Sequence, residues 1–382
     1  DFAIQWLPEA GSEEANRLNK DIARHVKARF CLNEGTHYKY HDELEYASEA
    51  EKWLQMAATE SDKLITSGRY EIYNTGHPQE DYFNMYRIDD KSDLKEAVLY
   101  VDYKTNIREH NMAAAGREAG CGFSKSFVES FLCSDGLPIS LSNKYLGDET
   151  MRKETANRDP RLKQLTLTND FPTNVTDDLK DSTFVVNEDE FITQHCFTGY
   201  RPIKGFNPIY SQALYMKSSF DGIAYRYAET LLINAEAKAE LNTITNADLD
   251  RTVNQLRDRV GMPHLTVNVG FTDPKWPDWG YSLSPVLQEI RRERCIELAG
   301  EGFRFNDLKR WKAGKLLNNV LTYVGKRKPD GNLAIVYPNY TNPDLSYQAG
   351  KSRTWEDKMY LYPIPTGELQ RNPQLLPQNP GW

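Results

Sequence analysis

Residues 103–111 (YKTNIREHN) hold the side chains best suited to recognise a ligand. This stretch follows a strand-like run and offers an aromatic ring, an amide, a guanidinium and an imidazole, on Tyr103, Asn106, Arg108 and His110. An aromatic face can stack on a sugar ring, and the three polar groups can form directional hydrogen bonds. Polyhydroxylated ligands need this combination, so we predict that these four side chains contact a ligand.

A second aromatic loop, residues 276–281, carries Trp276 and Trp279 between two predicted helical hairpins. These rings could contact the same ligand. They could instead fill the junction between the hairpins, because large aromatic side chains are also ordinary core material. Both interpretations stay open, with a small preference for packing.

Other motifs that suggest chemistry have simpler explanations. His37 and His41 have the i, i+4 spacing of a metal-binding pair, but no His-Glu-x-x-His motif and no third ligand accompany them. We interpret them as solvated histidines in a tyrosine-rich turn. Residues 120–126 lack the last glycine of a nucleophile elbow and the Gly-Lys-Ser/Thr of a phosphate loop, so we assign them to a loop. We therefore predict no catalytic and no metal-binding residues.

Two glutamates, Glu293 and Glu297, lie four residues apart on a predicted helix and repel each other unless cations intervene. Arg294, Arg304 and Arg310 are the nearest candidate cations in the sequence. We predict a partly buried network that ties this helix to the next one. The alternative, a catalytic acid pair, is the rarer arrangement.

Composition excludes several classes of protein. The 382 residues are 39% hydrophobic and 27% charged, with a formal net charge of −8. This acidic balance lacks the clustered basic footprint that nucleic acid requires. The five cysteines are widely spaced and form no C-x-x-C motif, which argues against a zinc knuckle or a dense disulfide framework. No apolar run approaches the roughly 18 residues of a membrane-spanning helix.

The first 70 residues are predicted to form a helical hairpin. Leu18, Ile22 and Val26 recur at four-residue intervals, which indicates one apolar helix face that ends near the turn-like residues 33–35. A second apolar stripe runs from residue 46 to residue 64. Two antiparallel amphipathic helices joined by a short turn form such a hairpin.

Residues 71–215 are predicted to form a loop-rich region on the ligand side. Two short runs of strand-forming residues, 97–101 and 183–186, stand among loops rich in Asn, Asp, Gly, Pro and Ser. Loops this extensive usually serve a function or surround a site. At the other end, residues 337–382 are rich in Pro, Asn and Gly, and we expect an extended segment.

Between these regions, residues 216–336 are predicted to form two helical hairpins comparable to tetratricopeptide units. The first helix is expected to start at Phe220 and to carry a stripe of alanines that lets a neighbouring helix approach closely. A second helix follows a cap at Thr245, a third follows a cap at Ser284, and a fourth begins near Phe303. The fold class is therefore mainly α, with helical hairpins as a scaffold and a loop-rich face that carries a few short strands.

Several motifs resemble, in the same order, those of the SusD/RagB family of nutrient-binding proteins. They occupy residues 135–139, 157–161, 220–241, 254–262, 290–298, 301–311, 361–365 and 379–382. Each motif is weak alone, but their shared order makes the resemblance strong. Departures are small: Trp382 stands where the family often has Tyr, and Asn306 where an aromatic residue is common. In the family, an N-terminal part with a lipid-attachment cysteine and some of the ligand pocket precedes these motifs, and we expect the same here.

The resemblance implies a single SusD/RagB-like domain over residues 1–382, built as an α-α superhelix. It also implies a lipid-anchored protein on the surface of the outer membrane of a Bacteroidetes-type bacterium. Such a protein binds an oligomeric nutrient, usually a glycan, and delivers it to a SusC-like TonB-dependent transporter, without catalysis or a cofactor. The alternatives are a peptide-binding member of the family, a glycan-processing hydrolase and a helical scaffold that binds only proteins.

Overall fold

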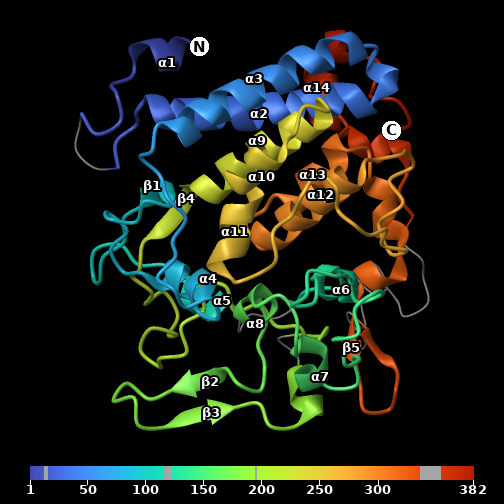
Figure 1. The fold of residues 1–382 in the computed structure, drawn as a ribbon. Coiled ribbons are helices and arrows are strands. Elements are labelled where there is room, and N and C mark those ends of the chain that lie inside the picture. Colours follow the sequence, from blue (N-terminus) through green and yellow to red (C-terminus); the bar gives the residue numbers. More distant parts are fainter. Residues whose placement is uncertain (13–15, 116–121, 194–195, 336–353) are drawn as a thin grey trace.

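Long helices stack in one half of the molecule, and short helices, turns and small sheets form the other half (Figure 1). The computed structural model describes all residues except 13–15, 116–121, 194–195 and 336–353. This architecture confirms the mainly α prediction. Among the described helices, none is long and apolar enough to cross a membrane.

An antiparallel helix pair, α2 (Lys20–Tyr40) and α3 (Ala47–Thr66), follows the short α1 (Phe2–Trp6) and covers one side of the stack (Figure 1). The Asn19 side chain caps α2 by accepting hydrogen bonds from two backbone N–H groups of the first turn. The predicted hairpin is therefore present, and the second helix ends where the sequence indicates.

Helix α2 buries Ile22 as predicted, but the rest of its buried face differs from the predicted stripe. Leu18 and Val26 are 60% and 40% exposed, whereas His25 and Ala28 are fully buried. The predicted turn at residues 33–35 is also wrong, because α2 continues through it. Gly35 is needed there for close helix packing, since a Cβ at this position would lie 2.8 Å from Cγ of Leu54 in α3.

The helix predicted from Phe220 begins later, because residues 222–226 form a strand. This strand, β4 (Gly222–Arg226), pairs antiparallel with β1 (Ala97–Val101), the strand predicted at that position. The alanine-rich helix α9 (Tyr227–Glu240) follows at once and packs against both α3 and α12 (Pro285–Glu297). The pairing brings residues 103–111 beside residues 218–221.

Helices α10 (Asn246–Asp250) and α11 (Val253–Arg259) occupy the stretch predicted as one helix. The predicted caps at Thr245 and Ser284 are confirmed, and α13 (Arg304–Arg310) starts close to the expected position. These helices share one apolar core around α9, which includes Leu231, Leu232, Leu249, Val253, Leu256 and Ile290.

The loop-rich half contributes most of a second hydrophobic core, which Ile296 of α12 joins and which includes Tyr82, Phe131, Leu162, Tyr200 and Phe206. Its helices are all short: α4 (Asp81–Asn84), α5 (Met112–Ala115), α6 (Lys125–Ser130), α7 (Met151–Thr155) and α8 (Arg161–Leu165). A hairpin of β2 (Pro172–Val175) and β3 (Ser182–Phe184) stands at the end away from the long helices (Figure 1). The strand predicted at residues 183–186 thus corresponds to β3.

A last hairpin, β5 (Val324–Arg327) and β6 (Leu333–Ile335), lies within the region predicted as helical. Part of the predicted extended C-terminal segment lies outside the described residues. Its remainder includes the short helix α14 (Thr366–Arg371), so this segment is less extended than expected. Trp355 anchors it, because its ring fills the space above Gly314, where a Cβ would lie 2.0 Å from Cε2 of that ring.

Buried ion pairs connect the two halves through α12. Glu297 is fully buried and accepts hydrogen bonds from Arg226 at 2.6 Å, from Arg259 at 2.7 Å and from Arg161 at 3.0 Å. One turn earlier, Glu293 pairs with Arg161 and with an arginine of α11. The predicted network therefore exists, but its arginines come from β4, α8 and α11.

The arginines predicted as partners of Glu293 and Glu297 do not bind these two glutamates. Arg294 and Arg310 both bind Asp307, each at 2.9 Å, and Arg310 also pairs with Glu236 of α9 at 2.6 Å. Arg304 is exposed. Sequence proximity thus identified the wrong cations, because the fold brings distant arginines to Glu297.

Candidate functional site

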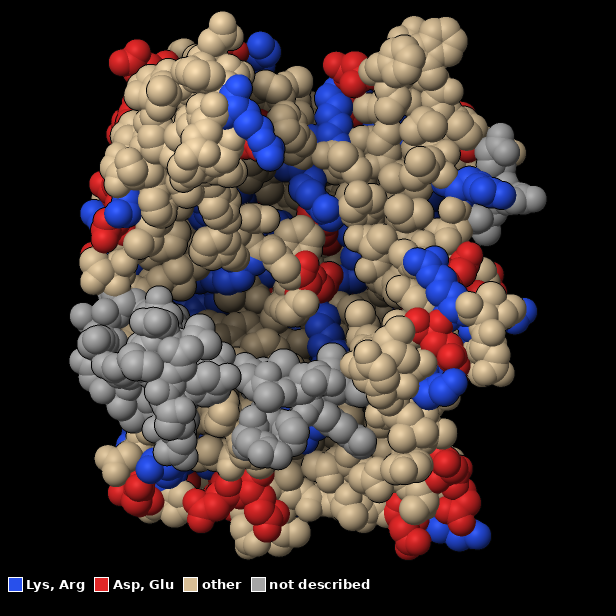
Figure 2. Space-filling model, turned by 180° about the vertical axis from the view of Figure 1, so that it is seen from behind, with Lys and Arg blue, Asp and Glu red and all other residues tan. Residues whose placement is uncertain are grey.

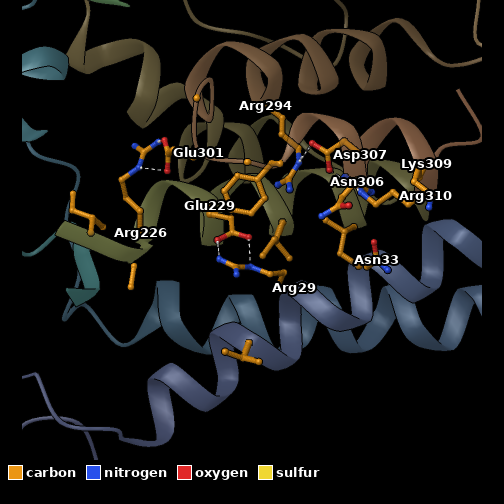
Figure 3. A pocket seen from close by; sticks show the side chains of 18 of the residues that line it. Arg29, Asn33, Arg226, Glu229, Arg294, Glu301, Asn306, Asp307, Lys309 and Arg310 are labelled. Carbon is orange, nitrogen blue, oxygen red and sulfur yellow. Dashed lines mark hydrogen bonds and ion pairs between the residues drawn. The ribbon is translucent and has the colours of Figure 1, made fainter. Parts of the chain in front are cut away.

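A cleft of about 1050 Å³ lies between α2 and α13 (Figure 3). Arg29 and Asn33 project into it from α2, and Asn306 and Lys309 project from α13 on the opposite wall. Strand β4, α9 and the turn at residues 300–303 form the base. Ligand pockets commonly have about 300–1,000 Å³, so this cleft can hold an oligomer.

Each carboxylate that lines the cleft in the described part of the chain is held by an arginine. Nε of Arg29 donates to Oε1 of Glu229 at 2.6 Å, and Nη2 of Arg226 donates to Oε1 of Glu301 at 2.7 Å. Asp307 receives the two arginines of the α12–α13 contact. The acidic side chains therefore build the walls and are already paired.

The electrostatics of the cleft fix the charge of these groups. Burial by itself raises the pKa of Glu229, but the charges and hydrogen bonds of His25 and Arg29 outweigh it and hold this pKa at about 2. The pKa values of Glu301 and Asp307 are also below normal, because arginines overcome the effect of burial. All three carboxylates are thus ionised at neutral pH.

Histidine 37 is neutral under the same conditions. Burial, followed by the nearby His41, lowers the pKa of His37 to about 4. Its ring stacks on that of His41 at a centroid distance of 4.0 Å. His41 is only 2% exposed and bonds through Nε2 to the carbonyl oxygen of Lys309 at 2.8 Å. The prediction of two solvated histidines in a turn is therefore wrong, because α13 covers the end of α2.

Four polar side chains of the cleft are available to bind a ligand. They come from the facing helices α2 and α13 and are Asn33, His37, Asn306 and Lys309. Within the described part of the chain, none of these side chains makes a hydrogen bond or an ion pair. The set can donate and accept hydrogen bonds, which suits a ligand that carries many hydroxyl groups.

An aromatic ring lies among these polar groups. The guanidinium carbons of Arg29 and Arg294 lie 5.1 Å and 5.3 Å from the ring centroid of Phe303, which lines the cleft. Cation–π contacts of this kind hold the ring in place.

The loop predicted from the sequence lies next to the cleft. Met112, directly after this loop, lines the cleft beside Gly205, where a Cβ would lie 3.1 Å from the Met112 side chain. In the loop, the guanidinium of Arg108 lies 4.9 Å from the ring centroid of Tyr103. Arg108 and Asn106 are exposed, and Asn106 has a φ of 63° at the tip of the turn. The structure thus brings the exposed side chains of the loop to the surface near one end of the cleft.

His110 has a different position from the other three residues of this loop. Its ring lies edge-on between Tyr103 and Phe220, at centroid distances of 4.4 Å and 4.7 Å. Nε2 donates to the carbonyl oxygen of Phe220 at 2.8 Å, and Nδ1 accepts from the Met112 backbone at 3.0 Å. Both ring nitrogens are therefore occupied, and this histidine positions the loop.

The two tryptophans face α12 instead of the cleft. Trp279 is 6% exposed, donates through Nε1 to Gln288 at 2.6 Å and packs edge-on against Trp311. Trp276 donates to Glu289 at 2.7 Å and is half-buried. This arrangement agrees with the packing interpretation of these rings.

Sequence reasoning assigns no ligand contact to any residue that lines the cleft. The sequence places Asn33 in a predicted turn, and Asn306 stands out in it only as a departure from the family pattern. That departure was a usable signal, because an amide in place of an aromatic side chain adds hydrogen-bonding capacity.

Three of the five cysteines, Cys31, Cys133 and Cys196, are buried thiols, and Cys121 lies outside the described residues.

Comparison with known proteins identifies the family. The model of the SusD family matches residues 56–382. SusD-like protein P2 of Formosa agariphila is 33% identical over 166 residues, which cover 44% of this chain and 27% of that protein. A SusD-like protein of Bacteroides fragilis has the same fold, with a TM-score of 0.68, 24% identity and coverage of 99% of this chain and 68% of its own. A SusD-like carbohydrate-binding protein of the same organism gives a TM-score of 0.65, 22% identity and coverage of 98% and 68%. This chain belongs to the SusD family.

Proposed function

We propose that this protein binds an oligomeric nutrient, a glycan, in the cleft between α2 and α13. The observation that carries the proposal is the set of four uncommitted polar side chains on the two facing helices. Asn306 is exposed and the other three are half-buried, so all four are accessible to a ligand, whose hydrogen bonds to them add affinity. The membership of the chain in the SusD family supports this assignment, as does the carbohydrate-binding description of one structural relative.

The exposed loop beside the cleft belongs to the same proposal. Tyr103 and Arg108 form a small platform, and Asn106 adds an amide at the tip of the turn. An oligomer that leaves the cleft past Met112 would meet this platform. We therefore assign the loop a contact with the outer units of the ligand.

Binding without catalysis suits the cleft better than hydrolysis does. A glycosidase needs a protonated acid with a raised pKa near a second carboxylate. The cleft acids Glu229, Glu301 and Asp307 all have lowered pKa values, and each is paired with an arginine. None of them is a suitable proton donor at neutral pH.

The same proposal includes the cellular role. The protein would stand on the outer membrane through a lipid anchor and deliver its ligand to a SusC-like TonB-dependent transporter. The support for this part is family membership alone. Co-purification of the native protein with such a transporter from outer membranes would test it, and recovery of the protein without any transporter would contradict it.

Calorimetric titration with panels of soluble oligosaccharides and of short peptides tests the binding itself. Asn306→Ala and Arg108→Ala are each expected to weaken glycan binding about fivefold, which corresponds to one hydrogen bond of about 1 kcal/mol. Asn268→Ala is the matched control, because Asn268 is exposed and lies outside the cleft.

Each outcome of this titration has a clear meaning. Affinity for peptides alone would show that the ligand is a peptide and not a glycan. Release of a cleavage product in the same samples would refute binding without catalysis. If Asn306→Ala binds as tightly as Asn268→Ala, the ligand does not use the cleft. If Asn306→Ala weakens binding but Arg108→Ala does not, the loop does not contact the ligand.

A further inference from the structure

The cleft is basic although the protein as a whole is acidic. Among the described residues, six cationic side chains line it against three acidic ones, whereas the whole chain has a formal net charge of −8. The cations are Arg29, Lys204, Arg226, Arg294, Lys309 and Arg310, and the acids are Glu229, Glu301 and Asp307. Figure 2 shows the molecule from behind, with Lys and Arg side chains gathered along a central hollow. A cleft that concentrates one sign of charge attracts ligands of the opposite sign.

Most of these cations already have carboxylate partners. Arg226 is neutralised from behind the wall by Glu297 and Glu96, and Arg310 by Glu236. Lys204 binds Glu301 at 2.7 Å. A simple count of charges therefore overstates the attraction, and the residues without a partner decide what the cleft can bind.

Among the described residues that line the cleft, Lys309 is the cation without a carboxylate partner. Its Nζ lies 4.0 Å from the ring centroid of Tyr362 and 5.9 Å from that of Phe305. Burial lowers the pKa of this ammonium group, and no carboxylate acts in the opposite direction. An ammonium group that has lost water without gaining a counter-charge favours the arrival of an anion.

The surroundings of Lys309 can complete an anion site. Asn306 precedes it by one turn of α13, and Asn33 projects from α2 across the cleft, as Figure 3 shows. Both amides can donate hydrogen bonds, and neither has a partner in the described part of the chain. One ammonium and two amide groups can together hold a carboxylate or a sulfate group.

We propose that the ligand of the cleft is an acidic glycan, whose carboxylate or sulfate group is bound by Lys309 with the amides of Asn306 and Asn33. This inference rests on the proposed function and narrows its substrate class. It assigns Lys309 the choice between charged and neutral sugars.

Titration of the full chain with matched pairs of oligosaccharides tests the inference. Uronate oligomers derived from pectin and alginate would be compared with their carboxyl-reduced neutral counterparts, and sulfated galactan oligomers with their desulfated counterparts. The charged member of at least one pair is expected to bind at least about tenfold more tightly, because charge-assisted hydrogen bonds are the stronger ones. The pair that shows the preference identifies the anionic group as carboxylate or sulfate.

Lys309→Gln should remove this preference, because a neutral amide cannot distinguish a charged oligomer from its neutral counterpart by charge. The matched control is Lys52→Gln, since Lys52 is an exposed surface lysine, paired with Glu49 at 3.2 Å and outside this cleft. Higher salt should weaken binding of the charged oligomers to the wild-type protein but not to Lys309→Gln.

Three results would overturn the inference. Equal or tighter binding of the neutral counterparts would refute the acidic ligand and leave the proposed glycan binding intact. An unchanged preference in Lys309→Gln would refute the role of this lysine. If no oligosaccharide binds at all, the proposed function fails together with this inference.

Discussion

Replacement of Glu297 by glutamine is the most direct test of the buried ion-pair network. Glu297 is fully buried on α12 and bonds to three arginines, from β4, α8 and α11. Burial alone raises the pKa of Glu297, but the charges of Arg259, Arg226 and Arg161 hold it far below the usual range. Glutamine keeps the shape of the side chain and removes its charge, so three guanidinium groups lose their common counter-ion.

The size of the effect follows from general magnitudes. Removal of one partner from a buried ion pair costs about 3–5 kcal/mol. The entropy of unfolding is about 2.1 cal/mol/K per residue, which gives about 0.8 kcal/mol/K for the 382 residues of this chain. A loss of about 4 kcal/mol therefore lowers Tm by about 5 °C.

Differential scanning calorimetry of Glu297→Gln measures this shift. The control is Glu49→Gln, because the Glu49 side chain is 49% exposed and its pair with Lys52 contributes little. The control should melt within about 1 °C of the wild type, as expected for a surface substitution. If Glu297→Gln melted there too, the network would contribute no net stability and its role in the fold would be refuted.

Four further outcomes are expected. The folded protein holds the pKa of Glu229 at about 2, against an ordinary value of 4.5, so the stability that this group contributes is complete above pH 4.5 and is lost as the pH falls toward 2. Chemical denaturation across this range should show a loss of about 3 kcal/mol that is absent in Glu229→Gln. Gly314→Ala should lower Tm because its Cβ would collide with the Trp355 ring, whereas Gly367→Ala, which meets open space, should not. Thr245→Ala should cost about 1 kcal/mol in denaturant melts through loss of the capping box. Trp279→Phe should leave glycan affinity unchanged in the same titrations, because this ring faces α12 and lies outside the cleft.

The sequence predicted the helices well where caps and periodicity agreed. Thr245 and Ser284 are N-caps in the structure, and the strand expected at residues 97–101 is β1. Errors arose where one signal had two physical meanings. Gly35 resembles a turn residue, but it serves a close contact with Leu54 inside a long helix. Such a contact depends on the partner helix, which no local pattern contains.

The start of α9 also depends on a contact that no local sequence pattern contains. Ala224 falls on the alanine stripe of this helix and fits its periodicity, yet it belongs to β4. Pairing with β1, which lies more than a hundred residues earlier, decides this conformation. Tertiary context of this sort routinely overrides local propensity.

The candidate site was harder to predict than the fold. Asn33 and Asn306 are ordinary polar residues on helices that are far apart in the sequence, and their position on facing walls follows only from the packing of α13 against α2. Their lack of partners among the described residues is a property of the folded state. The predicted loop, by contrast, was recognisable because Tyr103, Arg108 and His110 lie close together along the chain.

The buried ion-pair network also explains why the amides, the imidazole and the ammonium group of the cleft are available to a ligand. Arg226 and Arg310 line the cleft, and both are tied to carboxylates behind it, on α12 and α9. Arg29, on the opposite wall, is tied to Glu229 in the same way. These pairs fix the walls before a ligand arrives, so the ligand need not supply the free energy to order them. Because the acids are used for this purpose, the groups left for recognition are amides, an imidazole and an ammonium, and this composition favours a hydroxylated ligand with an anionic group.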